Sequence, residues 1–309
     1  YELVESNGIV PIRLSEKEYV RAHDFRRYLH KNLEDFIIET PLENPLDFLN
    51  KQFDASLIKD VQTKWIPYDF KNQNIDDFLE NLNIDKTVEI SSIQGGYSNA
   101  IKQLNKFIEV GYQDYAKYRS DPSKEASSQL SPYFHSGQIS THEVFDKISE
   151  LESWSPESIN PKMVGRREGW WGSSENFESF MDELITWREL GYHTCVRRAN
   201  YNQYSSLPEW AIKTLHEHSS DEREHIYSLD ELTYSQTHDE IWNAAQNQLR
   251  TQGVIQNYLR MLWGKKILEW TPNPQIALSY MITLNDRYSL DGRDPNSYSG
   301  VFWILGRYD

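Results

Sequence analysis

Three tryptophans are spaced so that they could carry an electron. Trp263 and Trp270 lie seven residues apart in a segment predicted to be helical, which places them on nearly one face, about 10 Å apart along the axis. Trp242 lies in the preceding predicted helix, and the short connection at Gly253 lets the two helices pack together. Three indoles within hopping distance could reduce a buried redox cofactor. Their spacing alone, however, favours ordinary core aromatics.

Two other groups of residues are suited to ligand binding. Glu183 and Trp187 lie four apart in a predicted helix and share one face, so a carboxylate and an indole could hydrogen-bond to a base and stack on it. Residues Tyr115–Pro122 lead into Ser127–Pro132, where serine hydroxyl and N–H groups before a helix could hold a phosphate. Taken alone, a solvated acid beside a core tryptophan and ordinary helix capping are the simpler explanations.

Polar residues also cluster in two predicted loops. The segment Asn285–Asn296 lies between apolar segments, so its polar groups are expected to be paired in a structured, partly buried loop. Arg166 and Arg167 lie close to Trp170 and Trp171, which suits a contact with a DNA backbone. An ordinary charged surface loop explains these four residues equally well.

Several kinds of site are excluded by the sequence. Cys195 is the single cysteine, which excludes a disulfide framework, a Cys-type zinc site and a Cys-ligated iron–sulfur cluster. His216 and His218 lie two apart and would face different ways on a helix, and there is no HExxH motif. No metal site is therefore predicted. The sequence also lacks a GxGxxG motif, a P-loop and a nucleophile elbow.

The composition is that of a globular chain with no membrane span. Of its 309 residues, 38% are hydrophobic and 26% are charged, the mean hydropathy is −0.72, and no apolar run approaches the ~18 residues of a membrane helix. The net charge of −15 argues against a general nucleic-acid binder. Residues 254–309, however, contain 6 basic and 5 acidic residues, which leaves room for a locally neutral or basic face.

Local signals outline the elements that must position these residues. A short apolar run ending at Ile9–Pro11 predicts a strand, Thr40–Ile93 has no sustained period and is typical of a linker, and helical signals dominate from Gly95 onward. Ser140 and Thr237 each begin a sequence with the spacing of a capping box, which predicts two helix starts.

Further helix boundaries follow from capping and turn residues. Ser174 is expected to cap a helix that reaches about Tyr192, and Gly253 is a plausible C-terminal glycine for the helix that begins near Thr237. The next helix is predicted to run from about Ile255 to Trp270, because the proline that follows stops it.

Five segments occur in an order that resembles one protein family. They are Leu130–Ser140, Glu183–Leu190, Trp242–Gln246, Tyr258–Trp270 and Leu284–Asn296. These segments resemble motifs of the photolyase/cryptochrome family, in particular DNA photolyases of the class II cyclobutane-pyrimidine-dimer type. The resemblance covers about Gly95 to Asp309, and residues 1–38 more loosely resemble the last strand and following helix of the family's α/β domain.

The resemblance implies a mainly α fold, in which a helical FAD-binding domain follows the tail of an α/β, Rossmann-like antenna domain. The implied divisions are an antenna remnant at 1–50, an interdomain linker at 51–94 and the catalytic domain at 95–309. Because the chain begins at Tyr1 and stops before the family's C-terminal hairpin, we expect a fragment of a longer protein. An antenna chromophore is left open.

The resemblance also implies an activity. A deoxyribodipyrimidine photolyase is a carbon–carbon lyase that uses light to repair cyclobutane pyrimidine dimers in UV-damaged DNA. Excited, reduced FADH⁻ would donate an electron to a dimer flipped out of the duplex, and the electron would return after the ring splits. We expect a monomer that does not contact membranes and that is located with the cell's DNA, in the cytoplasm if bacterial.

The cofactor roles that the resemblance implies fall on eleven residues. The FAD phosphates and ribityl chain would be held by Tyr115, Arg119, Ser127, Ser128, Gln129, Leu130, Ser131 and Gln138. Arg260 and Asp291 would form an ion pair beside the flavin ring, and Asn285 would lie near its N5 and help to set its redox state.

The remaining implied roles concern the substrate and electron supply. Glu183 would hydrogen-bond the dimer, and the lesion pocket would be lined by Trp187, Met261 and Trp303. The photoreduction path would be Trp263, Trp242 and Trp270, which reverses the interpretation favoured by spacing alone. Two departures from the family pattern are Gln256, where many relatives carry histidine, and Ser136, where the family carries phenylalanine.

Three other functions share part of this pattern of residues or of the helical fold. A cryptochrome-like blue-light receptor would share the fold and flavin, but it has no need of the dimer pocket formed by Glu183, Trp187 and Trp303. A (6-4) photolyase uses histidines beside the lesion, and the helix around Arg260 offers none. A purely structural helical protein would bind no flavin.

Overall fold

A computed structural model describes residues 8–38, 40–42, 44, 47, 55–66, 69, 71 and 74–308. The chain forms two compact units, Tyr1–Thr40 with Val88–Asp309, and Pro41–Thr87. The smaller unit contains α2 (Ala55–Lys64) and α3 (Ile75–Asn81). These helices lie within the segment interpreted as a linker or wrapping segment, and Asn74 caps α3 by accepting the N–H of Asp76.

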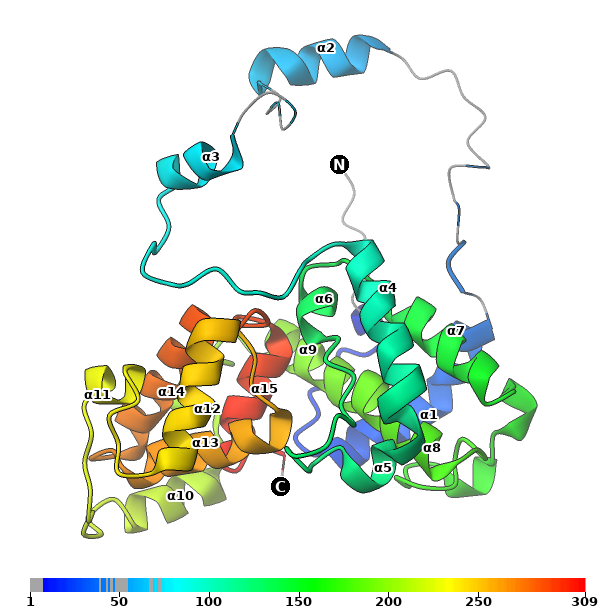
Figure 1. Ribbon diagram of the computed structural model, residues 1–309. Helices are drawn as coiled ribbons and strands as arrows, with labels where there is room; N and C mark the ends of the chain where they lie inside the picture. Colours follow the sequence, from blue (N-terminus) through cyan, green and yellow to red (C-terminus); the bar gives the residue numbers. More distant parts are fainter. Residues whose placement is uncertain are drawn as a thin grey trace. The chain divides into compact units, whose positions relative to one another are not determined.

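Two groups of helices, each with its own hydrophobic core, make up the larger unit (Figure 1). The first lobe consists of α1 (Ala22–Ile38), α4 (Tyr97–Lys106), η3 (Phe107–Gly111), η4 (Tyr112–Asp114), α5 (Tyr115–Tyr118), α6 (Ser131–His135), α7 (Thr141–Leu151), η5 (Pro156–Ser158), η6 (Pro161–Met163), α8 (Glu175–Met181), η7 (Asp182–Trp187) and α9 (Arg188–Arg197), preceded by η1 (Ile12–Leu14). Of these, η3 and η7 are π-helical turns.

The second lobe follows in the sequence and is drawn in yellow-green to red in Figure 1. After η8 (Tyr204–Ser206) it consists of α10 (Glu209–Glu217), α11 (Leu229–Thr233), α12 (Glu240–Gln252), α13 (Asn257–Glu269), α14 (Pro274–Tyr288) and α15 (Pro295–Ile304). In the part of the chain that the structure describes, the only bridge between extended residues joins Arg21 to Tyr308. The mainly α fold class is therefore confirmed, whereas the division at residues 50 and 94 stays a prediction.

Most of the predicted helix ends are confirmed by their caps. The side chains of Ser140 and Ser174 accept the N–H groups that begin α7 and α8, and Gly253 ends α12 with a left-handed φ of 75°. The capping box at Thr237 was wrong, because Asp239 accepts the Trp242 N–H instead and α12 begins two residues later. The predicted loop Asn285–Asn296 is also shorter than expected.

The loop is shorter because α14 continues through the first four residues of the predicted loop and ends at Tyr288. Leu284 and Tyr288 are both buried, so the apolar face of the helix persists for one more turn beyond the expected end. The helix starting after Ser174 is likewise longer than predicted. It continues through the π-helical turn η7 and ends at Arg197 rather than near Tyr192.

The described N-terminal residues are held against the first lobe by hydrogen bonds to a side chain and do not form a strand. The predicted strand at Ile9–Pro11 was wrong within the described residues, and the part of that run before Gly8 lies outside them. The buried carboxylate of Glu189 accepts the N–H groups of Ile9 and Val10, at 2.6 and 3.2 Å. These N–H groups therefore have a partner although no neighbouring strand supplies one.

The two lobes meet where α9 packs against α15 (Figure 1). Gly191 allows the close approach, because a Cβ there would come within 2.7 Å of Asn296 Oδ1. Tyr192 donates a 3.0 Å hydrogen bond to Asp294 Oδ2, and His135 Nδ1 lies 3.2 Å from the same oxygen. The side chain that caps α15 is thus held by two helices of the first lobe.

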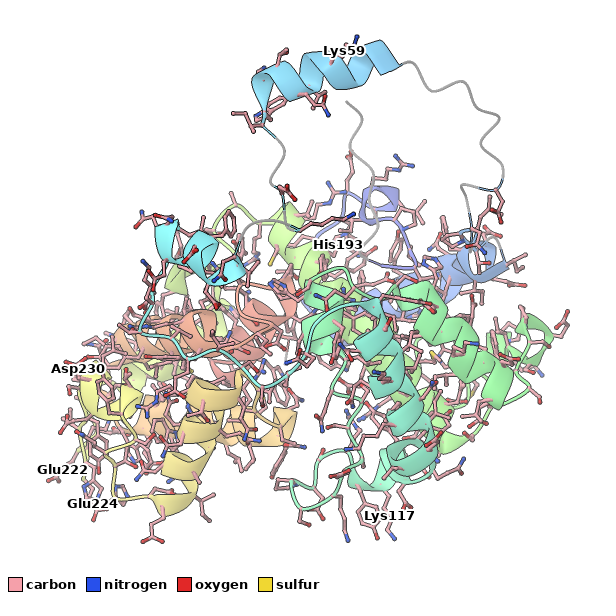
Figure 2. The ribbon with its side chains drawn as sticks, turned by 45° about the horizontal axis from the view of Figure 1, so that its top comes forward. Lys59, Lys117, His193, Glu222, Glu224 and Asp230 are labelled. Carbon is pink, nitrogen blue, oxygen red and sulfur yellow. The ribbon has the colours of Figure 1, made fainter. Side chains whose placement is uncertain are left out.

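Acidic side chains gather at one edge of the second lobe. Figure 2 shows Glu222, Glu224 and Asp230 along the segment that leads into α11 and on α11 itself. This cluster carries part of the net charge of −15. The charge of the chain is thus unevenly distributed over the molecule, as the residue counts along the sequence indicated.

His30 makes the stability of the first lobe sensitive to acid. Its ring stacks on Trp170 with centroids 3.9 Å apart, and its Nδ1 accepts the N–H of Gly165 at 3.1 Å. Burial, with Arg26 nearby, lowers the pKa of His30 to about 3. Between pH 6.5 and 3 the imidazole binds a proton in the unfolded chain but not in the folded chain. The free energy of unfolding therefore decreases as the pH falls through this range, by at most ~1.4 kcal/mol per pH unit.

We therefore expect His30→Gln to flatten the pH dependence of the unfolding free energy between about pH 6.5 and 4. Urea unfolding at several pH values measures the slope. His23→Gln is the matched control, because His23 lies on the same helix with its side chain 63% exposed. An unchanged slope in His30→Gln would show that other groups cause the acid sensitivity.

Candidate functional site

The three tryptophans form a continuous row inside the second lobe. Trp242 and Trp263 stack with centroids 6.4 Å apart and planes within 1°, and Trp270 meets Trp242 edge-on at 5.6 Å. All three are at most 4% exposed. Trp242 therefore lies between the other two, and the row follows the order in which the sequence predicted electron transfer.

Hydrogen bonds fix the indoles of this row. Trp242 Nε1 donates to the carbonyl of Trp263 at 3.0 Å, and Trp263 Nε1 donates to Gln246 Oε1 at 2.8 Å. Gln246 is fully buried and was not assigned a role from the sequence, although it lies four residues after Trp242 on α12. Buried polar groups require partners, so this amide orients the ring of Trp263.

Two further aromatic residues lie at the other end of the row. Tyr227 and His238 contact Trp270 with centroids 5.6 and 5.2 Å away, and the Tyr227 hydroxyl lies 2.7 Å from His238 Nδ1. Sequence reasoning missed both residues, since they lie outside the helices that carry the tryptophans.

An ion pair lies one turn before Trp263 on the same helix. Arg260 contacts both carboxylate oxygens of Asp291, at 3.2 and 3.4 Å. Burial alone would raise the pKa of Asp291, but Arg260 and hydrogen bonds from Ser289 and Ser131 hold it below its ordinary value. Asp291 is thus an anion bound by residues from both lobes, and its contact with Ser131 was not predicted from the sequence.

A second ion pair joins two residues for which the sequence predicted different ligands, FAD for Arg119 and the pyrimidine dimer for Glu183. Arg119 Nη1 donates to Glu183 Oε1 at 2.6 Å, and the guanidinium lies 5.9 Å from the centroid of the Tyr115 ring. Burial raises the pKa of Glu183, while Arg119 opposes the shift. Glu183 therefore lies closer to a protonation change at neutral pH than an ordinary glutamate.

The backbone beneath Glu183 is unusual. Residues Asp182–Trp187 form a π-helical turn, in which the N–H of Arg188 donates to the carbonyl of Glu183, five residues back. Glu183 and Trp187 were expected to share a face of a regular α-helix, and the π turn changes that geometry. Single π turns inside helices occur frequently at functional sites.

The predicted phosphate-binding segment lies against the start of α4 and the body of that helix. Gln138 Oε1 accepts the N–H of Gly96 at 2.8 Å, and the Ser128 carbonyl accepts Gln103 Nε2 at 2.9 Å. Gln129 has a left-handed φ of 55°, which turns the chain before the buried Leu130 that caps α6. Ser127 and Ser128 are half-buried within this turn.

The predicted lesion residues differ in exposure. Met261 is 7% exposed on α13, Trp303 is 40% exposed on α15, and Trp187 is half-buried with its ring 6.3 Å from that of Tyr308. Asn285 is 1% exposed, and its Nδ2 donates to the neighbouring Asp286 carboxylate at 3.4 Å. The structure thus places one exposed and one half-buried indole among these residues.

The polar groups of this region fit a flavin. Arg260 Nε is buried and has no hydrogen-bond partner, so an acceptor on a bound ring system would satisfy it. Among the described residues, no group of three or more His, Cys, Asp or Glu is placed to hold a metal ion. Nor, in the part that the structure describes, is any helix long and apolar enough to cross a membrane.

The two helical lobes define the class of protein by their fold. The structure superposes on the crystal structure of a bacterial class III photolyase from Agrobacterium tumefaciens with a TM-score of 0.59 at 19% identity. The match covers 98% of this chain and 54% of that one. The arrangement of helices is therefore the photolyase fold.

Sequence comparison is more specific. The chain is 35% identical over 307 residues to the deoxyribodipyrimidine photo-lyase of Methanothermobacter thermautotrophicus and 33% identical over 311 residues to that of Potorous tridactylus. Each match covers 99% of this chain, but the chain spans only 60% and 52% of those proteins. No model of a known protein family matches. These likenesses support the placing of the chain in the photolyase family.

Proposed function

We propose that the chain is the catalytic part of a class II-type photolyase that repairs cyclobutane pyrimidine dimers in UV-damaged DNA. One observation carries this proposal most directly. Within a single turn, α13 presents Arg260 of the partly buried ion pair, Met261 of the predicted lesion pocket and Trp263 of the tryptophan row. Cofactor, substrate and electron supply would therefore be positioned by one rigid element.

FAD, when bound in its reduced form, supplies the light-driven electron that this repair requires. The chain's own residues would hold it. Arg260 and Asp291 would fix the edge of the ring, the buried Asn285 amide would face it, and Ser131 would tie the phosphate segment to Asp291. The row Trp270, Trp242 and Trp263 would carry electrons to the site, and the exposed His238 lies beside Trp270 at the outer end of the row.

Glu183 would hold the dimer. Burial raises its pKa, Arg119 opposes that shift, and the ion pair with Arg119 keeps the carboxyl group oriented to hydrogen-bond the dimer. Trp187 and Trp303 would contact the rings of the flipped pyrimidines, since indoles offer large apolar faces to bases. The lesion would thus be held by one polar contact and two aromatic contacts.

The test compares Glu183→Ala with the unsubstituted protein, both prepared from the full gene. We expect the repair yield on UV-damaged oligonucleotide to fall by about tenfold, because one hydrogen bond involving a charged group is lost, while bound flavin is retained. Glu150→Ala is the control, since that side chain is 79% exposed. Flavin absorption and the recovery of intact thymines under light are the two measurements.

Three results would contradict the proposal in different ways. A protein purified without flavin absorption would exclude the whole assignment. Flavin binding without repair of cyclobutane dimers would favour a light receptor or a (6-4) photolyase. Loss of flavin in Glu183→Ala would place Glu183 at the cofactor instead of the substrate.

A further inference from the structure

We propose that Gln256 is a positioning residue that fixes the two lobes to each other across the flavin site. Its amide makes two hydrogen bonds that point in different directions. Oε1 accepts the N–H of Leu259 at 3.0 Å and so caps α13, while Nε2 donates to the carbonyl of Arg119 at 2.8 Å. A primary amide can do both because it carries an acceptor and a donor on one planar group.

The bond to Arg119 crosses between lobes that have separate hydrophobic cores. Arg119 follows α5 in the first lobe, and Gln256 precedes α13 in the second. The two clusters of buried residues are distinct, with Tyr115 of α5 in one and Trp263 of α13 in the other. At this end of the interface the amide of Gln256 is a direct polar connection.

The connection reaches both ion pairs of the site. Arg119 pairs with Glu183, and Arg260 pairs with Asp291. The backbone carbonyl of Gln256 also accepts the N–H of Arg260 at 2.9 Å, so displacement of the cap would displace Arg260. The amide therefore holds Arg119 of one lobe at a fixed distance from Arg260 of the other. The proposed flavin and dimer contacts depend on these two guanidinium groups.

Substitutions can separate the bridge from the cap. Gln256→Glu keeps an oxygen that caps α13 but loses the N–H donor and turns a carboxylate toward the Arg119 carbonyl. Gln256→Met keeps the length and loses both bonds. Gln256→His at pH 8 offers one ring nitrogen as donor and one as acceptor. Flavin affinity should therefore follow the number of bonds retained, with His above Glu and Glu above Met.

The experiment measures equilibrium binding of FAD to the stripped full gene product by flavin fluorescence. We expect Gln256→Glu to raise the Kd about tenfold, because one hydrogen bond is lost and a partly buried carbonyl is left unpaired, and Gln256→His to recover most of the affinity. Gln275→Glu makes the same charge change in the first turn of α14 at an exposed position and should bind like the unsubstituted protein.

This inference rests on the proposed flavin binding, and the experiment distinguishes failure of flavin binding from failure of the bridging role of Gln256. If the unsubstituted protein takes up no FAD, the proposed function is wrong. If it binds FAD and Gln256→Glu binds as tightly as Gln275→Glu, only the bridging role is overturned. Urea unfolding of the stripped variants checks that folding is intact. If Gln256→Glu does not fold, Gln256→Asn replaces it. The shorter Asn amide can cap α13 but cannot reach Arg119, so the same rise in Kd is expected.

Discussion

Trp242→Phe is expected to slow the light-driven reduction of bound, oxidised flavin by about an order of magnitude or more. Trp242 lies between Trp263 and Trp270, with ring centroids at 6.4 and 5.6 Å, so its removal interrupts the row at its centre. Phenylalanine fills much of the same buried space but is far harder to oxidise. The flavin absorption spectrum during blue illumination with an external reductant gives the rate.

The control for this variant is Trp210→Phe. Trp210 is 50% exposed at the start of α10 and contacts none of the three indoles of the row. It should leave the photoreduction rate unchanged. Equal rates in Trp242→Phe and the unsubstituted protein would mean that electrons reach the flavin by another route. Repair by chemically reduced protein should be unaffected, which separates electron supply from catalysis.

Arg26→Ala is expected to lower the free energy of unfolding by about 3–5 kcal/mol. Arg26 forms two hydrogen bonds with Asp182, at 2.7 and 2.9 Å, and both side chains are at most 9% exposed. Removing the guanidinium leaves a buried carboxylate, with only Arg167 Nε nearby at 3.9 Å. Urea unfolding followed by tryptophan fluorescence measures the loss.

Two further variants test the cause of this destabilisation. Arg27→Ala, on the exposed side of the same helix, should change stability by less than about 0.5 kcal/mol. The double variant Arg26→Met with Asp182→Leu should be more stable than Arg26→Ala, because no unpaired charge remains. A double variant as unstable as the single one would point to lost packing instead of an uncompensated charge.

The parts of the fold that depend on local signals were predictable from the sequence. Ser140, Ser174 and Gly253 mark helix ends because their caps involve residues only a few positions away. The expectation that Trp263 and Trp270 lie near each other followed from helical periodicity in the same way, and Trp242 lies between them. Thr237 failed because Asp239 offered a competing cap two residues later.

Features that depend on residues distant in the sequence were not predictable. Arg119 and Glu183 are 64 residues apart, and nothing in either segment indicates that they pair. The Glu189 carboxylate that holds Ile9 and Val10 lies about 180 residues away from them, so the same apolar run was interpreted as a strand. Such contacts are set by the packing of whole helices, which periodicity does not reveal.

The π-helical turn Asp182–Trp187 makes chain length itself a determinant of the site. Such a turn accommodates one residue more than regular α winding. Deleting one residue here would return the segment to regular α winding while α8 and α9 keep nearly the same relative orientation. Gly191 and Tyr192 would then still face α15, to which they are fitted. A homologue with a one-residue gap at this turn should therefore keep the interface between its lobes but direct the side chain that corresponds to Glu183 differently.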